Sequence, residues 1–107
     1  MRFLRKGRSL APMIRHIVLW RLKSADEATL RTIRRALESQ LGRVPGLSRV
    51  EVGHSFNTGR RAVDLALTCD FESRDALGAY HRHPVHLETR AIVDPLVTEH
   101  WISDYEV

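Results

Sequence analysis

Residues 14–23 have the alternating pattern of a β-strand, and both faces of this strand are apolar at its middle. One face carries Val18 and Trp20, whereas the other carries Ile17 and Leu19. Because a strand that is apolar on both faces must be shielded from water on both, its sheet needs a packed layer on each side.

The next segments predict a helix and a β-hairpin. Ser24 followed by Glu27 is the pattern of a capping box, and it predicts a helix over residues 25–42 that Gly42 ends. Its apolar residues recur at helical spacing: Leu30, Ile33, Leu37, Leu41 and Val44. Strands are predicted over Leu47 to Phe56 and over Ala62 to Phe71. The polar residues 57–61 between them predict a turn that pairs the two strands.

The last part of the chain predicts a broken helix and a final strand. Ser73 is placed to cap a helix containing Ala76, Leu77 and Tyr80, which breaks at His83-Pro84. A further helical turn or two is expected through Ile92, and a strand over residues 97–105. The order βαββαβ predicts an α+β, ferredoxin-like fold, in which two helices cover one face of a four-stranded, mainly antiparallel sheet.

This architecture leaves the second face of the sheet uncovered. A second copy of the chain is the simplest cover, because two such sheets packed face to face bury both apolar faces. We therefore expect a homodimer that forms a dimeric α/β barrel. A cavity is expected either between each sheet and its helices or inside the barrel.

The basic character of the chain belongs to its first twelve residues. Arg2, Arg5, Lys6 and Arg8 lie there without any acidic residue, and the remaining 13 Lys and Arg equal the 13 Asp and Glu in number. Residues 1–12 are thus predicted to be a disordered basic extension. It is either the result of a start codon upstream of Met13 or an arm that touches phosphate or a membrane. A nucleic-acid surface is not predicted for residues 13–107.

The chain contains one cysteine, so no disulfide can form within it. Cys69 lies in an apolar strand and is expected to be a buried small hydrophobe, which suits the reducing cytoplasm. Charged residues interrupt every apolar run near the start, and no run approaches the roughly 20 residues that span a bilayer. We therefore expect a soluble, cytoplasmic protein.

Residues 80–86 are the best candidate for chemistry, because they hold three of the six histidines and one of the two tyrosines. Proline fixes its own φ and favours an extended residue before it, so His83 should cap a helical turn that begins at Pro84 and contains His86. A histidine suits proton transfer near neutral pH. His81 should point to solvent. A metal site is not predicted, because Pro84 splits the histidines across a corner.

The residues resemble the stress-responsive A/B barrel (Dabb) domain family, within the wider dimeric α/β barrel group. The resemblance covers nearly all of residues 13–107. It rests on five segments in order: 13–23, 44–53, 64–73, 80–86 (Tyr-x-x-His-Pro-x-His) and 103–106.

The resemblance implies a small organic ligand and, in one branch, a reaction. Plant polyketide cyclases of this family close a linear chain by aldol condensation without metal or cofactor. Their acid/base pair corresponds to Tyr80 and His86, with His86 as base and Tyr80 as a hydrogen-bond donor. His16, His83 and Trp20 are predicted to line the substrate cavity. No cofactor is predicted.

Two other functions remain compatible with the sequence. One is a non-catalytic stress-response or interaction protein whose barrel is only a stable dimer. The other is a monooxygenase-like activity on an aromatic ligand or haem, as in other dimeric α/β barrels. Whether the chain is an enzyme is therefore left open by the sequence.

Overall fold

The structure, a computed structural model, describes residues 12–107. The elements follow in the order β1 (Ile14–Leu22), α1 (Glu27–Glu38), β2 (Leu47–His54), β3 (Leu65–Phe71), α2 (Arg74–Tyr80), α3 (Pro84–Val93) and β4 (Val97–Glu106), with a 3-10 turn at Asp94–Leu96 before β4. The strands form one sheet in the order β2-β3-β1-β4, and every neighbouring pair is antiparallel. The predicted ferredoxin-like α+β fold is thus confirmed.

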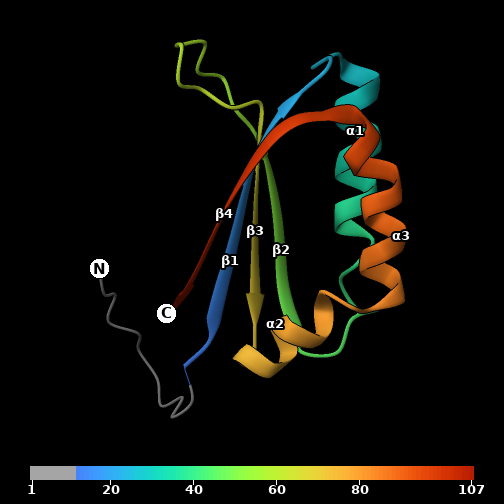
Figure 1. Cartoon of the computed structure of the whole chain (residues 1–107), viewed down its shortest axis with the longest axis vertical. Helices are drawn as coiled ribbons and strands as arrows, with labels where there is room; N and C mark the ends of the chain where they lie inside the picture. The colour runs from blue at the N-terminus through green and yellow to red at the C-terminus, as the bar shows by residue number, and fades with distance from the viewer. Residues whose placement is uncertain (1–11) are drawn as a thin grey trace.

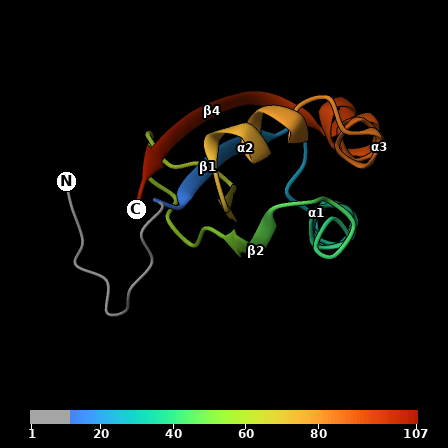
Figure 2. The ribbon, with the colours of Figure 1, turned by 90° about the horizontal axis from the view of Figure 1, so that it is seen from below.

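The helices lie together on one side of the sheet. Figures 1 and 2 show α1 and α3 side by side, with α2 at the end of the sheet where β3 ends. None of the helices within residues 12–107 is long and apolar enough to cross a membrane. The basic extension predicted over residues 1–12 lies, apart from Pro12, outside the described residues.

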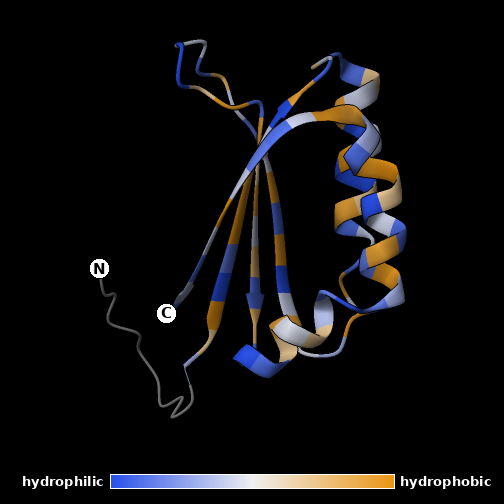
Figure 3. Ribbon diagram, in the orientation of Figure 1, coloured by the Kyte–Doolittle hydropathy of each residue, from blue (hydrophilic) through white to orange (hydrophobic). Residues whose placement is uncertain are grey.

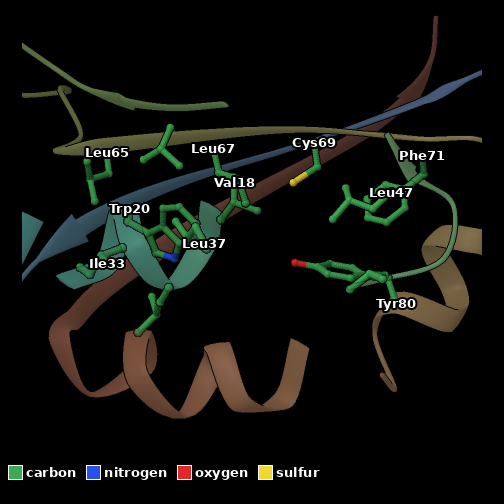
Figure 4. Packing of buried hydrophobic residues seen from close by; sticks show 14 of the residues in the cluster. Val18, Trp20, Ile33, Leu37, Leu47, Leu65, Leu67, Cys69, Phe71 and Tyr80 are labelled. Atoms are coloured by element: carbon green, nitrogen blue, oxygen red, sulfur yellow. The ribbon is translucent and has the colours of Figure 1, made fainter. Parts of the chain in front are cut away.

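The face of the sheet that meets the helices carries the hydrophobic core. Val18 on β1 pairs with Leu67 on β3 and with Ile102 on β4, so all three point to this face. Apolar and polar residues alternate along the strands in Figure 3, and the buried side chains gather between sheet and helices in Figure 4. Cys69 is fully buried there, as predicted, and burial raises the pKa of its thiol to about 12. It is therefore a packing residue and not a reactive thiol.

The opposite face has an apolar band between two charged ends. Leu19 pairs with Ala66 on one side and Trp101 on the other, and Ala66 pairs in turn with Gly53, so the band crosses all four strands. No helix of the described chain packs against this face, as Figure 2 shows. The prediction that β1 is apolar on both faces is confirmed, and one of those faces lacks cover within the single chain.

The first helix is shorter than predicted. Asp26 and not Ser24 is its N-cap, because the Asp26 carboxylate accepts a hydrogen bond of 2.7 Å from the Thr29 amide. Ser24 instead donates to that carboxylate. The helix ends at Glu38, so Leu41 is not part of it and does not continue its apolar face. Leu41 is consequently exposed, whereas Gln40 is fully buried.

The hairpin is confirmed, but its loop is longer than predicted and runs over residues 55–64. The Arg21 side chain holds this loop by donating to the backbone oxygens of Arg60 and Ala62. The Asp64 carboxylate also accepts from the Leu22 amide, and the Asp64 amide donates to the Trp20 carbonyl. These contacts attach the loop to β1 just before β3 begins. Phe56, expected in a strand, is almost fully exposed in the loop.

The predicted corner at His83-Pro84 is present. Ser73 caps α2, with its hydroxyl accepting from the Ala76 amide, and the helix ends at Tyr80. The His83 ring nitrogen Nδ1 accepts a hydrogen bond of 3.0 Å from the Val85 amide, which caps α3 at the position before Pro84. The helix that follows has ten residues and is longer than the turn or two expected.

Two glycines in the left-handed region allow a test of how α2 is positioned. Gly46 has a φ of 80°, and a Cβ added there would lie 2.6 Å from the Cβ of Ala76 on α2. Gly42 has a φ of 84°, but a Cβ added there would have no atom within 4 Å. Gly42→Ala should destabilise the fold by about 1–2 kcal/mol through its backbone alone. Gly46→Ala should lose roughly 1–3 kcal/mol more, because Ala76 must move. Urea unfolding of both variants measures this difference, and equal losses would contradict the close contact.

Candidate functional site

One cavity of about 170 Å³ brings together four of the five predicted site residues. His16 and Trp20 reach it from β1, Tyr80 from α2 and His86 from α3. Its other lining residues come from all sides: Val18, Leu37, Leu67, His81, Thr89, Arg90, Val93, Asp94, His100 and Ile102. Much of the wall is apolar, and the polar lining residues lie mainly at the α2–α3 corner and along α3. Sequence elements that are far apart thus share one small site.

His83 is the predicted site residue that does not line the cavity. Its ring accepts the hydrogen bond from the Val85 amide, so it serves the backbone of α3. This cap, together with Pro84, sets the direction in which α3 leaves the corner. His86 in the first turn of α3 is thereby turned back toward Tyr80 at the end of α2, with the two ring centroids 4.1 Å apart.

Tyr80 is buried, and its hydroxyl has a protein partner. The hydroxyl donates to Oε1 of Gln40 over 3.0 Å, and Gln40 is itself fully buried. Figure 4 shows the Tyr80 ring beside Leu47 and Phe71, with its oxygen directed away from both. Burial raises the pKa of the Tyr80 hydroxyl well above its usual range. The phenol is therefore protonated at any ordinary pH.

His86 is neutral at physiological pH. Its Nδ1 atom is buried and has no hydrogen-bond partner within the described residues. Burial lowers the pKa of His86 to about 4, and electrostatic interactions with His81, Arg90 and His16 act in the same direction. Asp94 opposes this shift to a smaller extent. A neutral imidazole with a free lone pair can accept a proton from a ligand in the cavity.

His16 is held by a carboxylate on the neighbouring strand. Its Nδ1 lies 2.5 Å from Oδ1 of Asp104, which is its direct cross-strand partner on β4. The Asp104 carboxylate thereby fixes the orientation of the His16 ring. The His16 ring, nearly fully buried, also lies edge-on to Tyr80 at 6.1 Å between centroids.

His81 differs from its expected role. It is exposed, as predicted, but its ring also borders the cavity, 6.0 Å from His16 and 5.9 Å from His86 between centroids. Its electrostatic interaction with His86 is one cause of the lowered pKa of His86. Within residues 12–107, no group of three His, Cys, Asp or Glu side chains is arranged to hold a metal ion.

Sequence reasoning missed Gln40 and Asp104 as parts of the site. Gln40 follows α1, which ends at Glu38 and not at the predicted residue 42, so the helical spacing favours Leu41 as the buried residue. Asp104 could have been found by pairing the alternation of β4 with that of β1, because both His16 and Asp104 fall on the inner face. The strand register needed for that pairing is decided only by the folded sheet.

The sequence matches the family described as Stress responsive A/B Barrel Domain (Dabb) over residues 14–107. No protein with a curated description matches the chain.

Several solved structures share the fold. A dimeric ferredoxin-like protein of unknown function from Bacteroides fragilis is 25% identical, with a TM-score of 0.78 over 89% of this chain and 96% of the other. Another from Thermobifida fusca is 22% identical, with a TM-score of 0.81 over 98% and 100%. The hydroxynitrile lyase from Passiflora edulis is 19% identical, with a TM-score of 0.78 over 89% and 93%.

The lowered pKa of His86 predicts a dependence of stability on pH. An unfolded histidine takes up a proton near pH 6.5, whereas folded His86 stays neutral down to about pH 4. The unfolded state therefore binds more protons in this window, so the free energy of unfolding should fall as the pH drops from 6.5 to 4. His86→Gln should make this fall shallower when urea unfolding is measured at several pH values. His54→Gln changes an exposed histidine on β2 and is the control, so it should leave this pH dependence of the unfolding free energy unchanged. The same pH dependence in His86→Gln as in the wild-type chain would contradict the burial of His86.

Proposed function

Since this chain belongs to the stress-responsive A/B barrel (Dabb) family, we propose that it is a homodimer that binds a small organic molecule in the cavity beside Tyr80 and His86 and performs acid/base chemistry on it. The observation that carries this proposal is the convergence of His16, Tyr80 and His86 on one cavity with mainly apolar inner walls. Such a combination of an apolar pocket and a few convergent polar groups is typical of small-molecule sites. A cytoplasmic location, supported by the single buried cysteine, is part of the same proposal.

His86 is the proposed base. It is neutral at pH 7 and borders the cavity, so it can take a proton from a bound molecule. The imidazolium that results is stabilised by the negative charge that develops on the ligand and by Asp94 nearby. Tyr80 remains protonated and holds a hydroxyl group of the ligand beside His86 by accepting a hydrogen bond from it. His16, fixed by Asp104, completes the polar side of the cavity.

The proposed reaction class is the making or breaking of a carbon–carbon bond next to an oxygen-bearing carbon. In an aldol-type closure, the base removes a proton α to a carbonyl, and the resulting enolate attacks a second carbonyl. In cleavage of a hydroxynitrile, the base takes the hydroxyl proton, the C–C bond to the nitrile breaks, and cyanide leaves with the bonding pair before it is protonated. The similar fold of the Passiflora edulis hydroxynitrile lyase makes the second reaction the practical first test.

Mandelonitrile is a suitable probe, and its cleavage is followed by the absorbance of benzaldehyde. The wild-type chain should release benzaldehyde faster than buffer does. His86→Ala should lower kcat/KM by about 10²–10⁴-fold, since it removes the base. Tyr80→Phe should lower it by roughly tenfold, as expected for one hydrogen bond.

His54 does not line the cavity, so His54→Gln serves as the control and should retain wild-type activity. Full activity in His86→Ala would contradict the role of His86. If the wild-type chain releases no benzaldehyde, lyase activity on hydroxynitriles is excluded.

The proposed dimer uses the uncovered face of the sheet. Its centre is the apolar band through Leu19 and Trp101, and the Arg21 guanidinium lies 5.3 Å from the centroid of the Trp101 ring. At the other end, Asp70 is paired with Arg15 at 2.8 Å and with Arg49 at 3.6 Å. An apolar centre with a polar rim is typical of protein interfaces. Two structural neighbours that are described as dimeric support the formation of a dimer.

Sedimentation velocity tests the dimer directly. The wild-type chain should sediment as a dimer at micromolar concentration. Trp101→Asp should shift it toward monomer, because the charge would be buried without a partner at the centre of the interface. Leu41→Asp is the matched control, since Leu41 is similarly exposed but lies at the end of α1 away from the uncovered face. A monomeric wild-type chain, or a dimer unaffected by Trp101→Asp, would contradict this interface.

A further inference from the structure

We propose that Gln40 is a positioning residue that orients the Tyr80 hydroxyl as a hydrogen-bond acceptor toward the cavity, so that the site selects ligands carrying a hydroxyl donor. The inference deepens the proposed function and rests on its claim that the cavity binds a small molecule. It follows from counting donors and acceptors along a buried chain of three groups: the Leu37 carbonyl, the Gln40 amide and the Tyr80 hydroxyl.

The first link determines the orientation of Gln40. One end of its side-chain amide lies 3.2 Å from the backbone oxygen of Leu37. A carbonyl oxygen can only accept, so the amide nitrogen Nε2 must face it; a flipped amide would place two oxygens against each other. Gln40 is fully buried, so water cannot satisfy the alternative orientation.

The second link determines the direction of the Tyr80 hydrogen bond. With Nε2 at Leu37, the other end of the amide is Oε1, which lies 3.0 Å from the Tyr80 hydroxyl. An amide oxygen can only accept, so the single hydroxyl proton of Tyr80 must point to Gln40. The remaining hydrogen-bonding capacity of the phenol oxygen is that of an acceptor.

The third link concerns the ligand. Tyr80 lines the cavity, whereas Gln40 lies behind it and does not. A ligand group that meets the phenol oxygen without breaking the bond to Gln40 must therefore donate a hydrogen. A hydroxyl or enol satisfies this requirement, whereas an ether oxygen would face lone pairs and lose its hydration. The direction of this bond is opposite to the donor role that the family resemblance implied for Tyr80.

Phenol and anisole are suitable probes, because the cavity volume of about 170 Å³ is similar to the roughly 150 Å³ that accommodates benzene in a dry apolar cavity. Their dissociation constants can be measured by NMR chemical-shift titration. The wild-type chain should prefer phenol to anisole by about tenfold, which corresponds to one hydrogen bond. The contribution of the extra methyl group of anisole to the binding free energy cancels when this preference is compared between variants.

Gln40→Met keeps the length of the side chain but removes the acceptor. The freed Tyr80 hydroxyl can then donate to either probe, so the preference for phenol should fall to within about twofold. Tyr80→Phe should lose the preference as well. Ser39→Ala is the matched control: it removes a hydrogen bond to the Ala36 carbonyl at the same helix end without touching Tyr80, and should keep the full preference.

A second measurement uses the wild-type chain alone, without a ligand or a variant. In the wild-type chain, the hydroxyl proton of Tyr80 should exchange slowly with water and show a nuclear Overhauser effect to the Gln40 side chain. A rapidly exchanging hydroxyl proton, an unchanged preference in a folded Gln40→Met variant, or no preference for phenol in the wild-type chain would each overturn the inference. Because these readouts are binding and proton exchange, they are independent of mandelonitrile cleavage, so failure of the reaction and failure of this inference can be told apart.

Discussion

The central strand β1 is the element on which the rest of this structure depends. It pairs with both β3 and β4, so its side chains occupy the middle of each face of the sheet. The inner row around Val18 meets the helices and closes the core, while Leu19 lies in the apolar band of the opposite face. The requirement to shield both rows from water explains why one face carries the helices and why the other is suited to a partner.

The same strand positions the polar side of the cavity. His16 lies two positions before Val18 on β1, so both residues are on the inner face. His16 therefore faces the interior although it is a polar residue. Its direct neighbour on β4 is Asp104, which satisfies the buried ring nitrogen. A buried histidine without such a partner would be unfavourable. The helices leave much of β4 exposed on this side, and that edge of the cavity remains accessible to a small molecule.

The helical corner at His83-Pro84 adds the second half of the site. The break between α2 and α3 separates Tyr80 from His86 along the chain, and yet it brings their rings close together at an interplanar angle of 42°. The environment then gives each ring a fixed state: burial keeps the Tyr80 phenol protonated and the His86 imidazole neutral. Gln40, anchored by the Leu37 carbonyl, determines where the phenol proton points. The chemistry of the site thus depends on residues behind the cavity as much as on those that line it.

The sequence alone determined the order of the strands along the chain and the helix break at His83-Pro84, because alternation, capping side chains and proline act over a few neighbouring residues. Ser73, His83 and Pro84 acted as predicted for this reason. The tertiary structure decided what depends on distant partners: the early end of α1 that buries Gln40 in place of Leu41, and the long loop drawn in by Arg21. It also decided the register that brings His16 to Asp104. Those contacts join residues 40 or more positions apart, and no local pattern reports on them.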